Sequence, residues 1–249
     1  MQLQLIRNAT LRLSYHNQTL LIDPFFAPKD AGDPLVGNAR NPMVDLPLSI
    51  EDILHDVDLV IISHLHFDHF DPVAQAHLPK DLPILCQPGD EDKIREHGFS
   101  QVTPLTEAHS WQGITITRTA GEHGSGKWGE RMGRVMGFVL QADDEPTLYW
   151  TGDTIWVDAV AERIQRHQPR VIVTHSCGAA FEAGSPIVMD AADTLRTCQT
   201  APDATVIATH MEALDHATVD RATLRAAAND AGIPPERLRI PQDGDTLIL

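Results

Sequence analysis

The feature that most constrains the fold of this chain is an eight-residue stretch, Ser-His-Leu-His-Phe-Asp-His-Phe, at positions 63–70. The four residues before it, Leu-Val-Ile-Ile, are apolar and typical of a buried strand. Side chains alternate between the two faces of an extended chain, so His64 and His66 point the same way. If the chain then turns into a helix, Asp68 and His69 are directed to a neighbouring point. The stretch therefore predicts two adjacent metal ions, one bound by each pair.

The types of ligand in this stretch favour a catalytic centre over a structural one. Histidine suits zinc, copper, iron and nickel, and carboxylates add harder, charged ligands. Structural zinc sites are closed and usually rich in cysteine, whereas a catalytic site keeps a position open for water. Only His and Asp occur in this cluster. We expect two divalent ions, with zinc as the leading candidate and manganese or iron as alternatives.

The 249 residues suffice for one large domain or two small ones, and since no break in composition marks a boundary, we expect a single domain, 1–249. The hydrophobic share of 42% supports a sizeable core. No run of about 18 apolar residues occurs, which counts against a membrane span. The first seven residues lack the basic and apolar regions of a signal peptide. The three cysteines are too few and odd in number for a disulfide framework. These features predict a cytoplasmic location.

The formal net charge of −16 limits the partners of the chain. Nucleic-acid binders concentrate positive charge, so an acidic surface counts against a nuclease that acts on long polymers. A small anionic substrate stays compatible with this charge if basic residues gather locally. The oligomeric state stays open, because the four tryptophans suit core, pocket or interface positions.

Strand and helix patterns alternate along most of the chain, which is typical of two sheets covered by helices, an α/β layered sandwich. Strand patterns occur at 3–6, 10–15, 19–23, 58–62, 83–86, 114–119, 135–140, 147–151, 170–174, 204–209 and 245–249. Helical patterns occur near 71–78, 90–97, 156–167, 187–199 and 218–231. A proline-rich segment, 24–48, interrupts the series. Such a long loop is either a wall of the active site or a surface excursion.

The His-Leu-His-Phe-Asp-His motif resembles the His-x-His-x-Asp-His signature of the metallo-β-lactamase superfamily, and the resemblance spans about residues 3–248. It implies a four-layer αββα sandwich with the site at one edge, between the sheets. It also implies that the remaining ligands follow later strands in chain order. His123, Asp153 and His210 match these positions, with Asp153 as the ligand shared by both metals.

Two further histidines have more than one interpretation. His216 is a rival of His210 as the last ligand, but His210 leaves its strand directly. His216 then orients a ligand or donates a proton. His175 also leaves a strand and is a weaker candidate for the same role, either orienting a ligand or donating a proton to the leaving group. Asp68 is expected to orient the nucleophile in addition to binding metal.

Within the superfamily, three short strings are similar to a branch of uncharacterised metal-dependent hydrolases that includes ascorbate-6-phosphate lactonase-like proteins. They are Ile22-Asp23-Pro24, the Ser-His-Leu-His-Phe-Asp-His-Phe-Asp form of the motif, and the Thr-Gly-Asp-Thr turn that contains Asp153. The resemblance therefore implies a hydrolase of a small molecule.

A glycine-rich stretch, 121–137, offers the best clue to the substrate. Its basic residues, Lys127, Arg131 and Arg134, outnumber its two glutamates, against the charge of the whole chain. As a flexible loop beside the metals, it would bind a phosphate or carboxylate group. The alternative is an ordinary hairpin with solvated charges.

These observations predict a reaction in which a hydroxide that bridges two metal ions attacks a carbonyl or phosphorus atom. The leading hypothesis is a hydrolase of a small, anionic ester or lactone. One alternative is a phosphodiesterase or nuclease with the same centre. The other is a non-catalytic, metal-binding regulatory protein, which the complete set of seven ligand candidates argues against.

Overall fold

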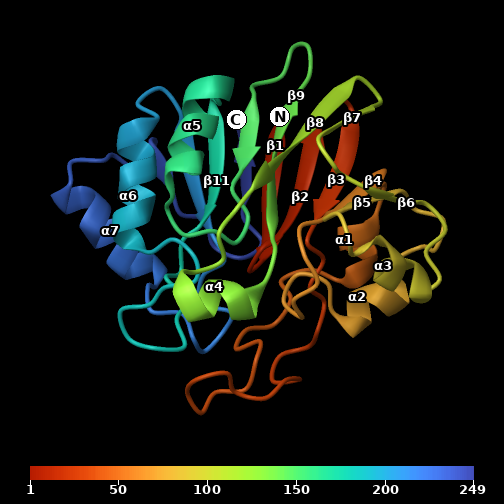
Figure 1. The fold of residues 1–249 in the computed structure, drawn as a ribbon, viewed down its shortest axis with the longest axis horizontal. Coiled ribbons are helices and arrows are strands. Elements are labelled where there is room, and N and C mark those ends of the chain that lie inside the picture. Colours follow the sequence, from red (N-terminus) through yellow and green to blue (C-terminus); the bar gives the residue numbers. More distant parts are fainter.

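Two seven-stranded sheets pack face to face at the centre of the computed structural model, which describes residues 1–249 (Figure 1). The first sheet has the spatial order β14 (Thr246–Ile248), β1 (Gln2–Arg7), β2 (Thr10–Tyr15), β3 (Gln18–Ile22), β4 (Leu59–Ile62), β5 (Ile84–Cys86) and β6 (Val102–Pro104). The second has the order β13 (Leu238–Arg239), β12 (Thr205–Thr209), β11 (Val171–His175), β10 (Leu148–Trp150), β9 (Met136–Gln141), β8 (Ile114–Ala120) and β7 (Ala108–Trp111). Each sheet begins with antiparallel hairpins and continues with parallel strands, β3 to β6 and β10 to β13.

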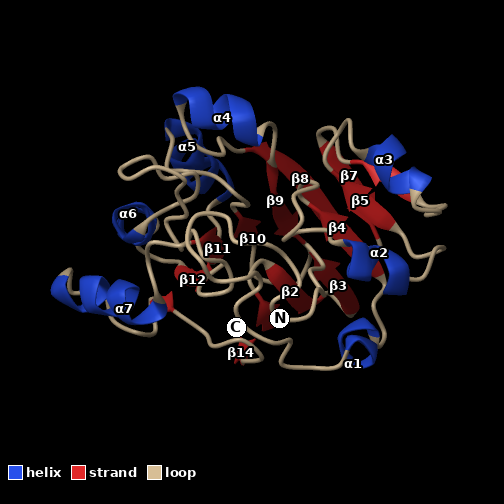
Figure 2. Ribbon diagram, turned by 90° about the horizontal axis from the view of Figure 1, so that it is seen from below, coloured by secondary structure: helices blue, strands red, loops and turns tan.

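Helices cover the outer face of each sheet. On the first sheet lie α1 (Ile50–Leu54), α2 (Pro72–His77) and α3 (Glu91–Glu96), and on the second lie α5 (Asp158–His167), α6 (Ala191–Thr200) and α7 (Arg221–Asp230) (Figures 1 and 2). This arrangement confirms the predicted αββα sandwich. No helix is both long and apolar enough to span a membrane.

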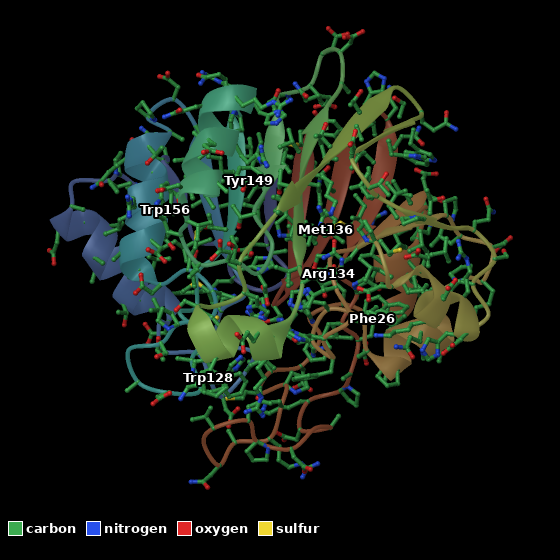
Figure 3. The ribbon with its side chains drawn as sticks, in the orientation of Figure 1. Phe26, Trp128, Arg134, Met136, Tyr149 and Trp156 are labelled. Atoms are coloured by element: carbon green, nitrogen blue, oxygen red, sulfur yellow. The ribbon has the colours of Figure 1, made fainter.

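Three apolar clusters separate the four layers. One, of 22 buried residues, lies between the sheets and includes Trp150. The second, of 20, lies between the second sheet and its helices and includes Tyr149. Tyr149 and its neighbour Trp150 point to opposite faces of the sheet. The third, of 14, lies under α1–α3 and includes Phe26, on the opposite side of Figure 3 from Tyr149. Strand β4 is buried throughout because a helical layer covers one of its faces and the other sheet covers the other.

Several elements differ from the expected ones. The glycine-rich stretch forms a short helix, α4 (Gly126–Met132), which lies at one edge of the sandwich (Figures 1 and 2). The helix expected at 187–199 begins only at Ala191, because the Asp190 side chain accepts a hydrogen bond from the amide of Asp193 and caps it there. Helix α1 and strands β6, β7 and β13 were not expected, since they are too short for a clear periodicity.

The topology brings the carboxyl ends of several strands to one edge of the sandwich. Strands β4, β10, β11 and β12 belong to the parallel parts of the two sheets, where ligand sites usually lie beyond the carboxyl ends. The proline-rich segment and α4 lie at the same edge, the lower one in Figure 1. Figure 2 looks onto this edge and shows loops filling the space between the two helical layers.

Candidate metal centre

The side chains predicted as ligands follow the ends of four strands. The first motif leaves β4, and His123 lies three residues beyond β8. Asp153 lies three residues beyond β10, and His210 directly follows β12. The backbone of His210 is left-handed, with φ 62°, which turns the chain sharply out of its strand. The fold therefore brings residues from 64 to 210 to a single point.

One group of ligand atoms consists of His64, His66, His123 and Asp153, all within 4.8 Å of one another. His64 Nε2 lies 2.9 Å from His66 Nδ1, so two ring nitrogens face each other. Asp153 Oδ2 lies 3.3 Å from His123 Nε2 and 3.8 Å from His64 Nε2. Three nitrogens and one carboxylate oxygen form a donor set typical of a divalent transition metal.

A second group lies beside the first and shares Asp153 with it. His69 Nε2 and His210 Nε2 are 3.3 Å apart, and Asp68 Oδ2 lies 3.5 Å from the former and 3.1 Å from the latter. Asp153 Oδ2 is 3.3 Å from His69 Nε2, and Asp153 Oδ1 is 3.7 Å from His210 Nε2. The structure thus brings all seven predicted ligands together, with the Asp153 carboxylate between the two groups.

The outward ring nitrogens of the ligands are anchored by the protein. His123 Nδ1 donates to the carbonyl of Ile187 at 2.7 Å, and His69 Nδ1 lies 2.5 Å from Asp23 Oδ2. These bonds fix the tautomer and turn the other nitrogen inward, as outer partners do in metal sites. Asp23 was not predicted for this role. Its contact with His69 is formed only by the fold, because the two residues are 46 positions apart.

His175 lies behind Asp153 and does not line the cavity, so its position does not suit a proton donor to the substrate. Its Nε2 accepts a hydrogen bond from Trp150 Nε1 at 2.9 Å, and indole nitrogen can only donate. Nδ1 of His175 therefore carries the proton and donates to Asp153 Oδ1 at 2.5 Å. The residue is fully buried. Since both ring nitrogens are engaged, the geometry favours an orienting role for His175 behind Asp153.

The charges of the centre follow from burial and from the neighbouring groups. Burial would raise the pKa of Asp153, but His69, His210 and His123 hold this pKa well below its ordinary value. Burial lowers the pKa of His64 and His123, so their rings are neutral at pH 7. For His69, burial is outweighed by Asp153, Asp68 and Asp23, which raise its pKa to about 10.

This arrangement fits two divalent cations. The neutral rings of the first group present lone pairs to a common point, and two buried carboxylates supply negative charge that a cation would balance. The protons on His69 and His210 stand where the second cation would lie, because both Nε2 atoms face Asp68. His64, His66, His123 and Asp153 would hold one ion, and Asp68, His69, His210 and Asp153 the other.

A cavity of about 170 Å³ opens directly onto these ligands. Its polar lining consists of His66, Asp68, His123, Asp153, His210 and His216. Its apolar lining consists of Leu35, Phe67, Met132, Ala179, Phe181, Ile187 and Val188. No Lys or Arg side chain lines it. Leu35 comes from the proline-rich segment, which agrees with the prediction that this segment forms a wall of the site.

The three basic residues of the glycine-rich stretch lie outside the cavity lining. Lys127 pairs with Glu182 at 2.6 Å, and both side chains are more than half exposed. Arg131 lies over the ring of Trp128, with its guanidinium 5.4 Å from the ring centroid. Arg134 is exposed. Their role in binding an anion stays a prediction, and the structure places Met132 of the same stretch against the cavity instead.

The comparison with known proteins agrees with this geometry. Residues 18–211 match the family model of the β-lactamase superfamily domain, which is more than half of the chain. The chain belongs to the metallo-β-lactamase superfamily. The relatives of this superfamily member place it in the uncharacterised branch of metal-dependent hydrolases, which confirms the predicted family.

Three relatives match this chain over nearly its whole length. It is 38% identical to UPF0173 protein YddR of Bacillus subtilis, over 99% of each chain. It is 40% identical to an isothiocyanate hydrolase from Delia radicum gut bacteria, with a TM-score of 0.94 over 100% of this chain and 99% of the other. It is 36% identical to a "possible metal-dependent hydrolase" from Veillonella parvula, with a TM-score of 0.96 and the same coverage. The chain is therefore a metal-dependent hydrolase.

Proposed function

We propose that this protein hydrolyses a small, uncharged electrophile with an apolar substituent, and that the leading class is the isothiocyanates. The observation that carries the proposal is the cavity, in which apolar side chains face the candidate metal ligands and no Lys or Arg side chain takes part. An anionic substrate would find no Lys or Arg to pair with beyond the metal ligands. An uncharged molecule has no such need.

The size of the cavity supports a small substrate. Pockets for drug-sized ligands typically measure about 300–1,000 Å³, whereas this one measures about 170 Å³. Phe67 stands between the ligands His66 and Asp68 and is 41% exposed, so an apolar ring is available at the mouth. Phe181 stacks on Trp128, with centroids 5.1 Å apart, and extends this apolar surface. An alkyl or aryl substituent would lie against these rings.

The 40% identical isothiocyanate hydrolase supports the choice of reactive group. An isothiocyanate is linear and uncharged, and its central carbon is electrophilic. Water adds to this carbon, the electron pair of the C=N bond passes to nitrogen, and nitrogen takes up a proton. The resulting thiocarbamic acid then releases carbonyl sulfide and the amine, so that one water is consumed for each amine formed.

The residues of the centre would divide this work. Two divalent ions, when bound, supply a water whose pKa falls toward about 7 and polarise the electrophile. Asp153, oriented by His175, holds its carboxylate between the two groups of ligands. Asp68 would hold one of these ions together with His210, and it faces the cavity, where it would orient the attacking water.

His216 is the residue that we propose to supply the proton. It is 7% exposed, lines the cavity, and its Nδ1 has no hydrogen-bond partner in the protein. Burial lowers its pKa, so the ring is neutral at pH 7, and it would accept the proton that the attacking water loses and pass it to the substrate nitrogen. Its ring also packs against Phe181, 5.4 Å away between centroids, which places it beside the apolar wall.

An ester or a lactone remains the second candidate substrate class. Its carbonyl carbon is attacked by the same activated water, and an uncharged ester with an apolar substituent suits the same cavity. A phosphodiester, in contrast, brings a negative charge into a chain of net charge −16.

A panel of four substrates distinguishes these classes. Metal-free protein and protein reconstituted with zinc, manganese or ferrous iron would be incubated with benzyl isothiocyanate, phenyl acetate, γ-butyrolactone and bis(4-nitrophenyl) phosphate. We expect metal-dependent release of benzylamine as the fastest reaction. Preferential opening of the lactone or ester would favour the second class. Phosphodiester turnover alone would overturn the proposal in favour of a phosphodiesterase, and silence on all four, with two metals bound, in favour of a non-catalytic protein.

A further inference from the structure

A carboxylate outside the metal centre binds three consecutive backbone amides. Asp215 Oδ1 accepts from the amide of Leu35 at 2.9 Å, and Oδ2 accepts from the amides of Gly37 at 2.8 Å and Val36 at 3.3 Å. The contact joins two segments about 180 residues apart in the sequence. Hydrogen bonds to a charged acceptor are stronger than those between neutral groups, so this contact defines the position of residues 35–37.

Asn41 completes the contact from the other end of the same segment. Its Nδ2 donates to Asp215 Oδ1 at 2.9 Å, and its Oδ1 accepts from the Asp215 amide at 2.9 Å. Asn41 is 1% exposed, and its backbone pairs with that of Gly32. Residues 32 and 41 therefore close the base of an excursion, and Asp215 holds the part of it that reaches toward the cavity.

The excursion touches the cavity through one side chain, Leu35. Asp215 is followed directly by His216, which lines the same cavity. A Cβ at position 37 would lie 3.3 Å from Asp215 Oδ2, so glycine allows the close approach of the backbone to the carboxylate. The single side chain of Asp215 thus links two walls of the cavity that come from opposite ends of the sequence.

We propose that Asp215 is a positioning residue that sets the selectivity of this site for apolar substituents by holding Leu35 at the cavity. The inference rests on the proposed function, since it concerns the substituent of the same substrate. Both carboxylate oxygens of Asp215 are already engaged, so the residue acts through Leu35 and not on the reacting atoms. The hydrogen bonds also keep the carboxylate charged, because they hold the pKa of Asp215 below its ordinary value against the opposing effect of burial.

The test compares kcat and KM for benzyl and methyl isothiocyanate, which differ only in the substituent. Asp215→Ala should lower the ratio of the two kcat/KM values about tenfold, mainly through a higher KM for the benzyl compound. Asp215→Asn keeps one acceptor oxygen and should give an intermediate ratio. Asp33→Ala removes an exposed carboxylate of the same excursion, whose side chain pairs only with Arg40, and should leave the ratio unchanged.

A double-mutant cycle with Leu35→Ala separates positioning from a general loss of structure. If Asp215 acts through Leu35, Asp215→Ala should have no further effect on the ratio in the Leu35→Ala background. An equal fall of the ratio in both backgrounds would overturn the proposal. So would an equal fall of kcat/KM for both compounds.

A binding experiment keeps the proposal testable if the proposed function fails. Benzylthiourea and methylthiourea have the same two substituents but lack the electrophilic N=C=S group, and calorimetry on the metal-loaded protein gives their affinities. Asp215→Ala should weaken binding of the benzyl compound about tenfold more than that of the methyl compound. If neither isothiocyanate is turned over but the variant still loses affinity selectively for the benzyl compound, only the proposed reaction is rejected. Equal affinities of the variant and the wild type would reject the role of Asp215.

Discussion

Asp153 is the residue on which most contacts of the centre converge. Its two oxygens lie within 4.0 Å of five histidines. Four of these rings turn Nε2 toward the carboxylate, and the fifth, His175, donates through Nδ1. A carboxylate in this position joins the two ligand groups into one centre, so its loss should affect both metals together.

Replacement of Asp153 tests this directly. Asp153→Ala and the isosteric Asp153→Asn should both lower metal-dependent kcat/KM at least about a thousandfold, more than the roughly 10- to 100-fold typical of outer partners. Metal content would be measured by mass spectrometry, and circular dichroism would verify the fold. Full activity in a folded Asp153→Ala variant would contradict the assignment of this ligand.

The protonation of the metal-free centre gives a second prediction. His69, with a pKa of about 10, and His210, with a pKa well above its ordinary value, carry protons at pH 7. Metal ligands must be deprotonated, so binding of the second ion releases protons and its affinity rises with pH up to about 10. Calorimetry in buffers of different ionisation enthalpy measures this release. Binding without proton release at pH 7 would show that these two rings are not ligands.

The same shift has a consequence for the metal-free protein. A raised folded-state pKa means that protonation of His69 stabilises the fold fully below pH 6.5, and that this contribution is lost as the pH rises through about 10. At high pH a bound metal ion would supply the positive charge that the proton on His69 supplies at lower pH. The difference in stability between the metal-bound and metal-free proteins should therefore grow from pH 7 to pH 10.

Asp23 offers a test of the outer partners. Its Oδ1 accepts from the amide of Ser63 at 2.7 Å, and its Oδ2 contacts the Ser63 hydroxyl and His69 Nδ1. Asp23→Asn keeps the bond to the amide and tolerates the left-handed backbone at φ 43°, but it removes the charge behind His69. Metal affinity, measured by competition with a chelator, should fall about 10- to 100-fold with little change in unfolding temperature. Unchanged affinity would leave Asp23 with a purely structural role.

At the residue scale, the sequence predicted which side chains gather at the site better than it predicted the residues that anchor them. His64, His66, Asp68 and His69 lie in one short segment, so local geometry alone brings them together. Asp23 was visible only as part of a short string, because its contact depends on the pairing of β3 with β4. The basic residues of the glycine-rich stretch were visible in the sequence, but their contacts were not. Their charge suggested a binding site, but their direction depends on how α4 packs.

At the scale of elements, α4 and the loop after β11 together form one wall of the cavity. Trp128 from α4 stacks on Phe181, and Met132 of α4 and Ile187 line the cavity. The six glycines of the stretch 121–137 suggested a flexible loop, yet Gly133, at φ 78°, ends a helix that covers the site. Periodicity is weak over a single seven-residue helix, so its tertiary contacts decide the conformation.

Strand β9 contains a position at which only glycine fits. A Cβ on Gly137 would lie 2.5 Å from the carbonyl oxygens of Trp150 and Thr151 and 2.6 Å from Thr119 Oγ1. Two of these atoms belong to the backbone and cannot swing away. Gly137→Ala should therefore destabilise the protein by about 1–3 kcal/mol. Urea unfolding measures this, with Thr115→Ala, at an exposed position of β8, as the control. Equal unfolding midpoints would contradict the close packing of β9 on β10.

At the scale of the whole molecule, an acidic surface surrounds an apolar site. The chain carries a net charge of −16, yet its cavity is mainly apolar. Two of the three large hydrophobic side chains that are strongly exposed, Val36 and Phe67, lie next to or within the lining of the cavity. Exposed apolar surface concentrated at one site indicates a binding role. Composition predicted the acidic surface, but the apolar cavity depends on contacts between distant segments.

The two-sheet architecture could be predicted because alternating strand and helix patterns leave few ways to bury their apolar faces. The position of the substrate wall could not, since Leu35 lies in a segment whose backbone amides bind Asp215, about 180 residues further along the chain. In this sandwich the candidate metal ligands lie at strand ends, and the residues that would contact the substrate lie on the loops between the strands.

The measurement that tests the central claim most directly is a zinc titration of metal-free protein, followed by the release of benzylamine from benzyl isothiocyanate. Two groups of ligands that share Asp153 predict that activity rises to a plateau at two equivalents of zinc. A plateau at one equivalent would contradict the two-metal centre. Turnover without metal, or none at any loading, would contradict metal-dependent hydrolysis of this substrate class.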